Sequence, residues 1–150
     1  MYNKEQASKT KQKFWAGFGQ YMKPVPGESG EPVNWINYKT GNANVYFRMD
    51  AARDKAVISI EITHANAVER MQYYQQFTSL KKLLEQQGAF AWKWEPEFEK
   101  ETGGNISRIS DTLYNVNVMN EADWPAIIGF LKPRIIALDA FWQTVKDGFE

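Results

Sequence analysis

The stretch "VYFRMDAARDKAVISIEI", residues 45–62, constrains the fold more than any other part of the chain. Apolar and polar residues alternate on both sides of the tetrad "AARD". Such alternation predicts two strands with one buried face and one polar face, and the tetrad predicts the turn between them. We therefore expect an antiparallel hairpin with a well-specified register, because a slip of one residue would turn the apolar side chains toward water.

The preceding segment "NWINYKTGNA", residues 34–43, continues the alternation and contains a two-residue turn signal, Gly41-Asn42. With Asp50 opposite Lys55, the two turns predict a three-stranded meander. Its buried face would hold Ile36, Tyr38, Val45, Phe47, Met49, Ala56, Ile58, Ile60 and Ile62. Its polar face would hold Trp35, Asn37, Lys39, Asn44, Tyr46, Arg48, Asp50, Ser59 and Glu61.

Helical periodicity marks residues 4–22, 67–88 and 120–149, and strand patterns mark residues 89–98 and, less regularly, 105–118. The predicted order is αβββαββα. We expect an α+β fold in which the antiparallel meander gains one or two strands and packs against helices. A chain of 150 residues with 43% hydrophobic content suffices for one core, so residues 1–150 are expected to form a single domain.

The charges balance, with 18 basic and 18 acidic residues, so any binding to nucleic acid must be local. The chain has no cysteine, no secretory apolar run at its start and no apolar stretch of about 20 residues. We expect a cytoplasmic protein without a membrane partner. No phosphate-binding glycine loop, nucleophile elbow or histidine-rich motif occurs, and we therefore predict no cofactor, no metal site and no catalytic residue.

The candidate ligand-binding surface is part of the predicted polar face and consists of Trp35, Asn37, Tyr46, Arg48 and Glu61. Aromatic and arginine side chains there exceed what solubility requires. Trp35 and Arg48 fall opposite each other, which predicts a cation–π pair.

Two further residues have competing interpretations. Glu61 could be a remnant metal ligand, but pairing with Lys39 or Asn44 on the polar face is the simpler interpretation. His64, the one histidine, has no Ser, Cys or Asp partner at a motif spacing. We therefore expect a structural role at the strand end rather than a general base.

The chain also resembles a known family. The motifs "KFWAGFGQYMK", "VNWINYKTG", "VYFRMDA", "ISIEITH" and "DWPAIIGFLKPRIIALDAFW" occur in order. Over nearly the whole chain they resemble an uncharacterised bacterial domain family, whose members occur alone or at the C-terminus of nuclease-like proteins. The element order is also similar to the core of the restriction-endonuclease-like superfamily, whose catalytic motif places an Asp on the second strand and Glu-x-Lys on the third.

The chain departs from that catalytic motif. Thr63 stands where the motif has its Lys. In the predicted register Glu61 lies six residues beyond the partner of Asp50, about 20 Å away, whereas Mg²⁺ ligands lie at about 2.1 Å. The resemblance therefore implies a non-catalytic recognition or interaction module of a nuclease-like lineage, for protein or nucleic acid. A metal-dependent nuclease with a non-standard site, using a carboxylate such as Asp111, is the alternative.

The oligomeric state follows from the apolar surface of the C-terminal helix, which extends over much of its circumference. The first helix, through Phe14, Trp15 and Phe18, can cover it within one molecule. We expect a monomer in preference to a homodimer in which these helices pair.

Overall fold

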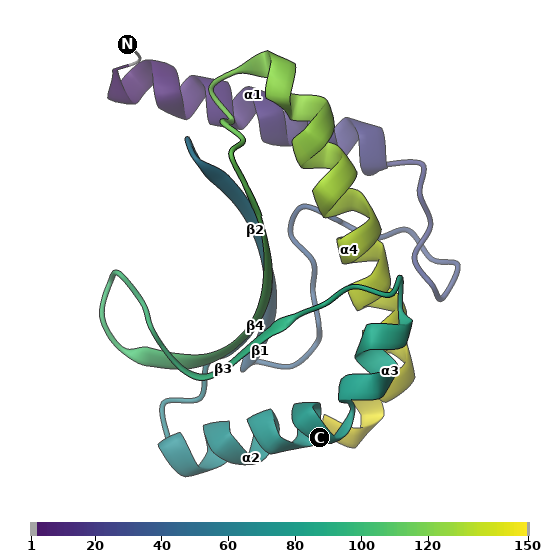
Figure 1. The fold of residues 1–150 in the computed structure, drawn as a ribbon. Coiled ribbons are helices and arrows are strands. Elements are labelled where there is room, and N and C mark those ends of the chain that lie inside the picture. The colour runs from purple at the N-terminus through teal and green to yellow at the C-terminus, as the bar shows by residue number, and fades with distance from the viewer. Residues whose placement is uncertain (1–2, 150) are drawn as a thin grey trace.

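The computed structural model describes residues 3–149. Its elements in chain order are α1 (Lys4–Met22), β1 (Val45–Ala51), β2 (Lys55–Ile62), α2 (Ala67–Ser79), α3 (Lys81–Gln86), β3 (Lys93–Glu99), β4 (Asn105–Tyr114), the 3₁₀ turn η1 (Glu121–Asp123), α4 (Trp124–Val145) and the 3₁₀ turn η2 (Lys146–Phe149). The strands form an antiparallel sheet in the order β1-β2-β4-β3 (Figure 1). This arrangement confirms the predicted α+β class.

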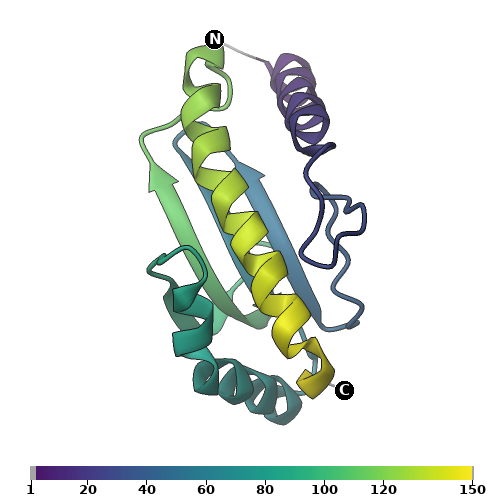
Figure 2. The same cartoon turned by 90° about the vertical axis from the view of Figure 1, so that its right-hand side faces the viewer.

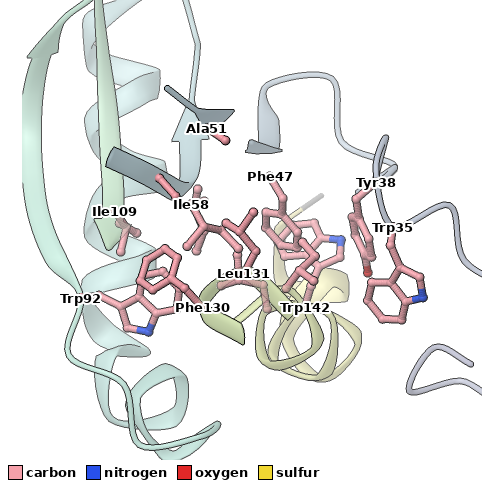
Figure 3. Packing of buried hydrophobic residues seen from close by; sticks show 14 of the residues in the cluster. Trp35, Tyr38, Phe47, Ala51, Ile58, Trp92, Ile109, Phe130, Leu131 and Trp142 are labelled. Atoms are coloured by element: carbon pink, nitrogen blue, oxygen red, sulfur yellow. The ribbon is translucent and has the colours of Figure 1, made fainter. Parts of the chain in front are cut away.

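The helix α4 runs along one face of the curved sheet and contacts β1 and β2. Ile127, Leu131, Ile135 and Leu138 recur at helical spacing along α4 and are fully buried. Such a stripe stabilises a helix by packing it against an apolar surface. Figure 2 shows α1 near the start of α4 and α2 and α3 near its end. The core therefore lies between α4 and the sheet, as Figure 3 shows.

The hairpin of β1 and β2 has the predicted faces and a shifted register. Asp50 pairs with Val57 instead of Lys55. The Ala52 N–H donates to the Lys55 carbonyl at 2.8 Å, so the turn is tighter than the expected tetrad. Because the shift is two residues, every side chain stays on its predicted face. Val45, Phe47, Ile58, Ile60 and Ile62 are buried, whereas Tyr46, Arg48 and Asp50 are exposed.

Residues 33–42 form a coil, although the segment 34–43 is predicted to supply the first strand of the meander and the turn after it. Trp35 and Tyr38 are both buried, although residues three apart would point to opposite faces of a strand. The Trp35 indole Nε1–H donates to the Val25 carbonyl at 2.9 Å, and the Tyr38 hydroxyl donates to the Asp139 carboxylate. The segment follows β1 as a coil, with the Tyr38 ring stacked on Phe47 at 5.0 Å. Contacts of Trp35 and Tyr38 with residues distant in sequence hold this segment, in place of the predicted pairing with β1.

Asp139 is the buried polar centre that holds this coil to α4, with 2% of its surface exposed. Its Oδ2 accepts the Glu28 N–H at 2.8 Å, and its Oδ1 accepts the Tyr38 hydroxyl. Burial, together with the hydrogen bond to Asp139, raises the pKa of Tyr38 above its usual range. Tyr38 therefore remains a hydrogen-bond donor at neutral pH.

The single helix predicted over residues 67–88 is two helices, α2 and α3, separated at Leu80, whose φ and ψ of −103° and 12° leave the helical region. The predicted C-terminal helix is confirmed as α4, which continues through Pro133. None of the helices in residues 3–149 has the length and apolar character that crossing a membrane requires.

The face assignment predicts how two neighbouring residues of β2 respond to substitution. Ile60 is 0% exposed, and Ile60→Ala should lower the free energy of unfolding by about 2–5 kcal/mol through lost burial and a residual cavity. Glu61→Gln should cost no more than about 1 kcal/mol, because its ion pair with the exposed Arg48 is screened by water. Urea unfolding followed by circular dichroism measures both changes. A larger cost for Glu61→Gln would contradict the assignment.

Candidate functional site

The sheet face opposite α4 is concave, and Figure 1 shows no helix crossing its centre in residues 3–149. The register and the alternation of side chains place a set of mostly polar residues on this face. They are Tyr46, Arg48 and Asp50 from β1, Lys55, Val57, Ser59 and Glu61 from β2, and Arg108, Ser110, Thr112 and Tyr114 from β4. We call this set the concave face.

Two arginines on the concave face are each held by an aromatic ring and a carboxylate. The Arg48 guanidinium lies 4.5 Å from the Tyr46 ring centroid, and its Nε is 3.5 Å from Glu61 Oε1. The Arg108 guanidinium lies 3.6 Å from the Phe98 ring centroid, and its Nη2 is 3.1 Å from a Glu95 oxygen. Stacking restricts each side chain while leaving N–H donors at its edge.

The concave face contains a hollow of about 410 Å³, within the size range of small-molecule sites. The hairpin of β3 and β4 curls toward this face (Figure 1), and its tip lines the hollow with Lys100, Glu101 and Thr102. Gly103 and Gly104 have φ values of 92° and 84°, which favour glycine and allow the tip to turn. Lysines therefore face the hollow from two sides, Lys55 from β2 and Lys100 from the tip.

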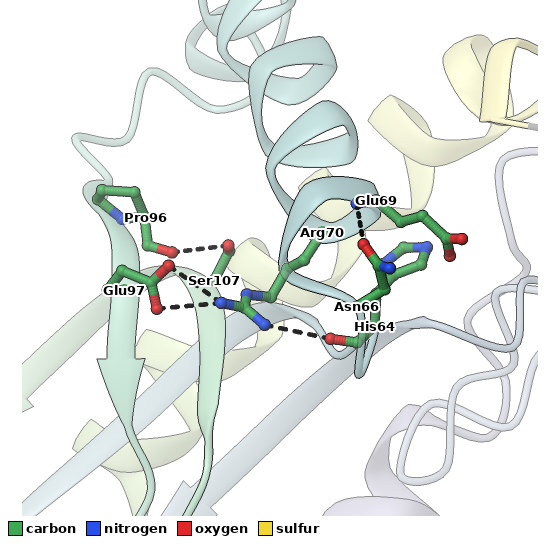
Figure 4. Close-up of polar contacts among 7 residues, drawn as sticks. All are labelled: His64, Asn66, Glu69, Arg70, Pro96, Glu97 and Ser107. Atoms are coloured by element: carbon green, nitrogen blue, oxygen red, sulfur yellow. Dashed lines mark hydrogen bonds and ion pairs between the residues drawn. The ribbon is translucent and has the colours of Figure 1, made fainter.

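Arg70 of α2 holds β3 of the curled hairpin at Glu97, three residues before Lys100 of the tip, as Figure 4 shows. Arg70 Nη2 lies 3.0 and 3.1 Å from the two oxygens of Glu97, and Nη1 donates to the His64 carbonyl at 3.2 Å. Arg70 is only 5% exposed, whereas the Glu97 side chain is 49% exposed, so solvent reaches the contact from the side of Glu97. Through these bonds Arg70 fixes the hairpin relative to α2 and the end of β2, and so determines where the tip lies.

The structure brings three of the five predicted site residues together. Tyr46, Arg48 and Glu61 meet on the concave face, and their role in binding stays a prediction. Trp35 is 3% exposed and packed against Tyr38, so the expected Trp35–Arg48 contact is wrong, as is the pairing of Glu61 with Lys39 or Asn44. Asn37 lies in the coil of residues 33–42, where its N–H donates to the Asn34 side chain.

Sequence reasoning missed Arg108, Arg70 and Lys100 as contributors. Arg108 and Arg70 join the site through contacts distant in sequence: Arg108 pairs opposite Glu61 across β2 and β4, and Arg70 reaches Glu97 from another element. Lys100 joins it because the hairpin tip lines the hollow. The alternation within β4 could have placed Arg108 on a polar face. No local signal indicated which strand lies beside it.

The carboxylates proposed for a nuclease are not grouped. Asp50 pairs with Val57, four residues from Glu61, a separation of about 13 Å instead of the 20 Å expected from the sequence. Asp111 lies on the helix-covered face, where the Arg134 Nε donates to its Oδ2 at 2.8 Å. Within residues 3–149, no three His, Asp or Glu side chains are placed to hold a metal ion together.

His64 lies just after β2 and is 6% exposed, with its ring 4.2 Å from that of Tyr73 in an edge-on arrangement. Its Nδ1 is buried and has no hydrogen-bond partner among the described residues. Burial lowers the pKa of His64 below its usual value, and the nearby Glu69 opposes this shift. The surroundings match the expected structural position at the strand end.

Comparison with known families gives one match. The model of a domain of unknown function, DUF4268, covers residues 10–146. The chain belongs to the DUF4268 family. This match confirms the expected membership of an uncharacterised domain family, and the concave face lies wholly within the matched residues of this DUF4268 domain. No curated protein and no solved structure matches the chain.

Buried His64 predicts how the stability of the DUF4268 domain depends on pH. In the unfolded chain a histidine gains its proton near pH 6.5, whereas folded His64 gains it only at lower pH. The stability contribution is therefore complete above pH 6.5 and is lost as the pH falls, by at most about 1.4 kcal/mol per pH unit. Urea unfolding between pH 7.5 and pH 5.5 measures the slope. His64→Gln should flatten it, and an unchanged slope would contradict this account.

Proposed function

We propose that this DUF4268 domain is a non-catalytic recognition module of a nuclease-like lineage that binds single-stranded nucleic acid on the concave face. The observation that carries the proposal is the pair of arginines, Arg48 and Arg108, each stacked on an aromatic ring beside the same hollow. Guanidinium groups in such positions suit phosphate oxygens because their donors are already oriented. The resemblance to domains of nuclease-like proteins favours nucleic acid over protein as the ligand.

The exposure of the charges supports an anionic ligand. The side chains of Glu61 and Glu95 are 21% and 20% exposed, whereas those of Arg48 and Lys93 are 57% and 73% exposed. Lys55 and Lys100 are also exposed. The outer layer of the face is thus mainly cationic although the whole chain is neutral.

Two exposed carboxylates, Asp50 and Glu101, line the same hollow and reduce the local positive charge. Electrostatic attraction alone therefore cannot supply the affinity. Exposed aromatic rings can supply a second contribution, since bases stack on them without regard to sequence. Tyr46 and Tyr114, at 37% and 66% exposure, lie at opposite ends of the concave face.

The alternative is a metal-dependent nuclease with a non-standard site. Such a site needs carboxylates around one point. Asp50 and Glu61 are separated along the sheet, and Asp111 lies on the other face, paired with Arg134. These positions favour binding over hydrolysis. We propose further that the domain acts as a monomer, because Phe14, Phe18 and Phe141 are buried in one core cluster within the chain.

Removal of one exposed ring tests the binding proposal. Tyr114→Ala should weaken binding of a labelled twelve-nucleotide DNA or RNA single strand by about 1–3 kcal/mol, or about 5- to 150-fold, through lost stacking. Fluorescence anisotropy at low salt measures the affinity. Tyr21→Ala is the matched control, because Tyr21 is 52% exposed on α1, where it contacts Lys132 of α4. Absence of binding by the unmodified protein, or equal binding by both variants, would contradict the proposal.

Incubation with the same oligonucleotides and Mg²⁺ or Mn²⁺ tests the non-catalytic assignment. We expect the strands to remain intact on a denaturing gel, because the carboxylates of the concave face do not converge. Cleavage that is lost in Glu61→Ala would overturn the assignment in favour of the nuclease.

A further inference from the structure

Two serines at the centre of the concave face have no assigned role. Ser59 of β2 and Ser110 of β4 are cross-strand partners, and they are 3% and 1% exposed. Neither hydroxyl bonds to another side chain or backbone group within residues 3–149, and neither oxygen is among the fully buried atoms without a partner, so both reach the surface of the face. A nearly buried hydroxyl without a partner is costly unless water or a ligand satisfies it. These two hydroxyls are therefore available to water or to a hydrogen-bonding ligand at the centre of the face.

The hydrogen-bond pattern of the sheet places the two serine side chains close together. The Thr63 N–H donates to the Asn44 carbonyl at 2.9 Å, which makes this pair hydrogen-bonded. Because such pairs alternate along antiparallel strands, the backbone groups of Ser59 point toward β1. Ser59 and Ser110 then form a non-hydrogen-bonded pair, whose Cα atoms are about 4.5 Å apart and whose side chains are closer than in the other pair type. Two hydroxyls at this spacing can donate to a single tetrahedral anion.

The serine pair lies in a cross-strand row with a cation at each end. Arg48 of β1 pairs with Ser59, and Lys93 of β3 pairs with Ser110. The neighbouring carboxylates on this face, Glu61 beside Ser59 and Glu95 beside Lys93, are each engaged with arginine or lysine. The row therefore combines hydroxyl donors with positive charge, which suits a phosphate group.

Each serine of the pair also lines a different hollow. Ser59 lines the hollow of about 410 Å³ beneath the hairpin tip, and Ser110 lines a second hollow of about 250 Å³. The second hollow lies where β4 extends past the start of β3, and its lining includes Thr112 and the exposed ring of Tyr114. A group bound on the serines would thus have a cavity on each side.

We infer that Ser59 and Ser110 form a binding site for one phosphodiester, which we call the serine site, with the two flanking nucleosides in these two hollows. This inference rests on the proposed function. It adds that the centre of the concave face recognises the phosphodiester of the nucleic acid. The hydroxyls donate to the non-bridging oxygens, and Arg48 and Lys93 neutralise the charge. The base in the smaller hollow stacks on Tyr114, whereas the base in the larger hollow lies between Lys55 and the hairpin tip.

Dinucleotides test the serine site, because each contains one phosphodiester and binds in one register. The probes are TpT, its uncharged methylphosphonate analogue, and UpU with its 2′-deoxy counterpart dUpdU, with affinities taken from NMR titrations. Neutralising the linkage should weaken binding to the unmodified protein about tenfold. The double variant Ser59→Ala/Ser110→Ala should bind TpT more weakly and lose less than tenfold with the analogue, because Arg48 and Lys93 still attract the charged linkage while the hydroxyl contribution is gone. Ser79→Ala on α2 is the hydroxyl control, and thermal denaturation verifies folding.

The possible outcomes separate the serine site from the proposed function. Two results would contradict the serine site while binding of longer strands remained. The first is an unchanged affinity of the double variant for TpT, and the second is the same loss of affinity with the analogue in both proteins. Absence of binding to longer strands would overturn the proposed function instead. Displacement of TpT by an equal concentration of inorganic phosphate would contradict the nucleoside contacts. Tighter binding of UpU than of its 2′-deoxy counterpart dUpdU would assign the ligand to RNA, and the reverse would assign it to DNA.

Discussion

The structure depends on the burial of one face of the β1–β2 hairpin beneath α4. The isoleucines of β2 and the apolar stripe of α4 are both fully removed from water. Strand side chains alternate between faces, so burial of one face directs every second residue to the other. Tyr46, Arg48, Ser59 and Glu61 share the concave face for this reason alone. The core thereby determines which side chains are available for binding.

The distance of each charge from the sheet on the concave face depends on the length of the side chain that carries it. A glutamate on a strand keeps its carboxylate near the sheet, whereas an arginine extends beyond it and covers the aromatic ring beside it. Glu61 and Glu95 compensate charge close to the sheet, whereas Arg48 and Lys93 above them remain accessible; Arg108 is no more exposed than its partner Glu95. This layering explains how a chain with no net charge can present a locally cationic surface.

The sequence predicted the parts of the fold that depend on local periodicity. The alternation in residues 45–62 predicted both faces of the hairpin, and the two-residue error in register left those faces unchanged. The strand predicted over residues 34–43 was wrong because Tyr38 bonds to Asp139 of α4, a contact that no local pattern encodes. Trp35 was misplaced for the same reason, since its indole bonds to Val25.

The rest of the candidate site could not be predicted from the sequence, because it depends on which strands are neighbours in the sheet. The chain passes from β2 through two helices to β3 before β4 returns beside β2. Only this order places Arg108 next to Glu61 and Ser110 next to Ser59. The β3–β4 hairpin could be predicted from its pattern, whereas the side of the hairpin that meets β2 is decided by packing across the whole domain.

The coil of residues 33–42 has one further consequence, which concerns the edges of the sheet. It runs along the outer side of β1, where Thr40 and Asn42 satisfy the backbone groups of Val45. At the opposite edge, Pro96 interrupts β3 with a residue that has no N–H, and Glu97 and Glu99 add negative charge. An unprotected edge strand can pair with another chain and begin aggregation. Because it satisfies the backbone groups of Val45 without adding a strand, the coil protects this end of β1 from pairing with another chain.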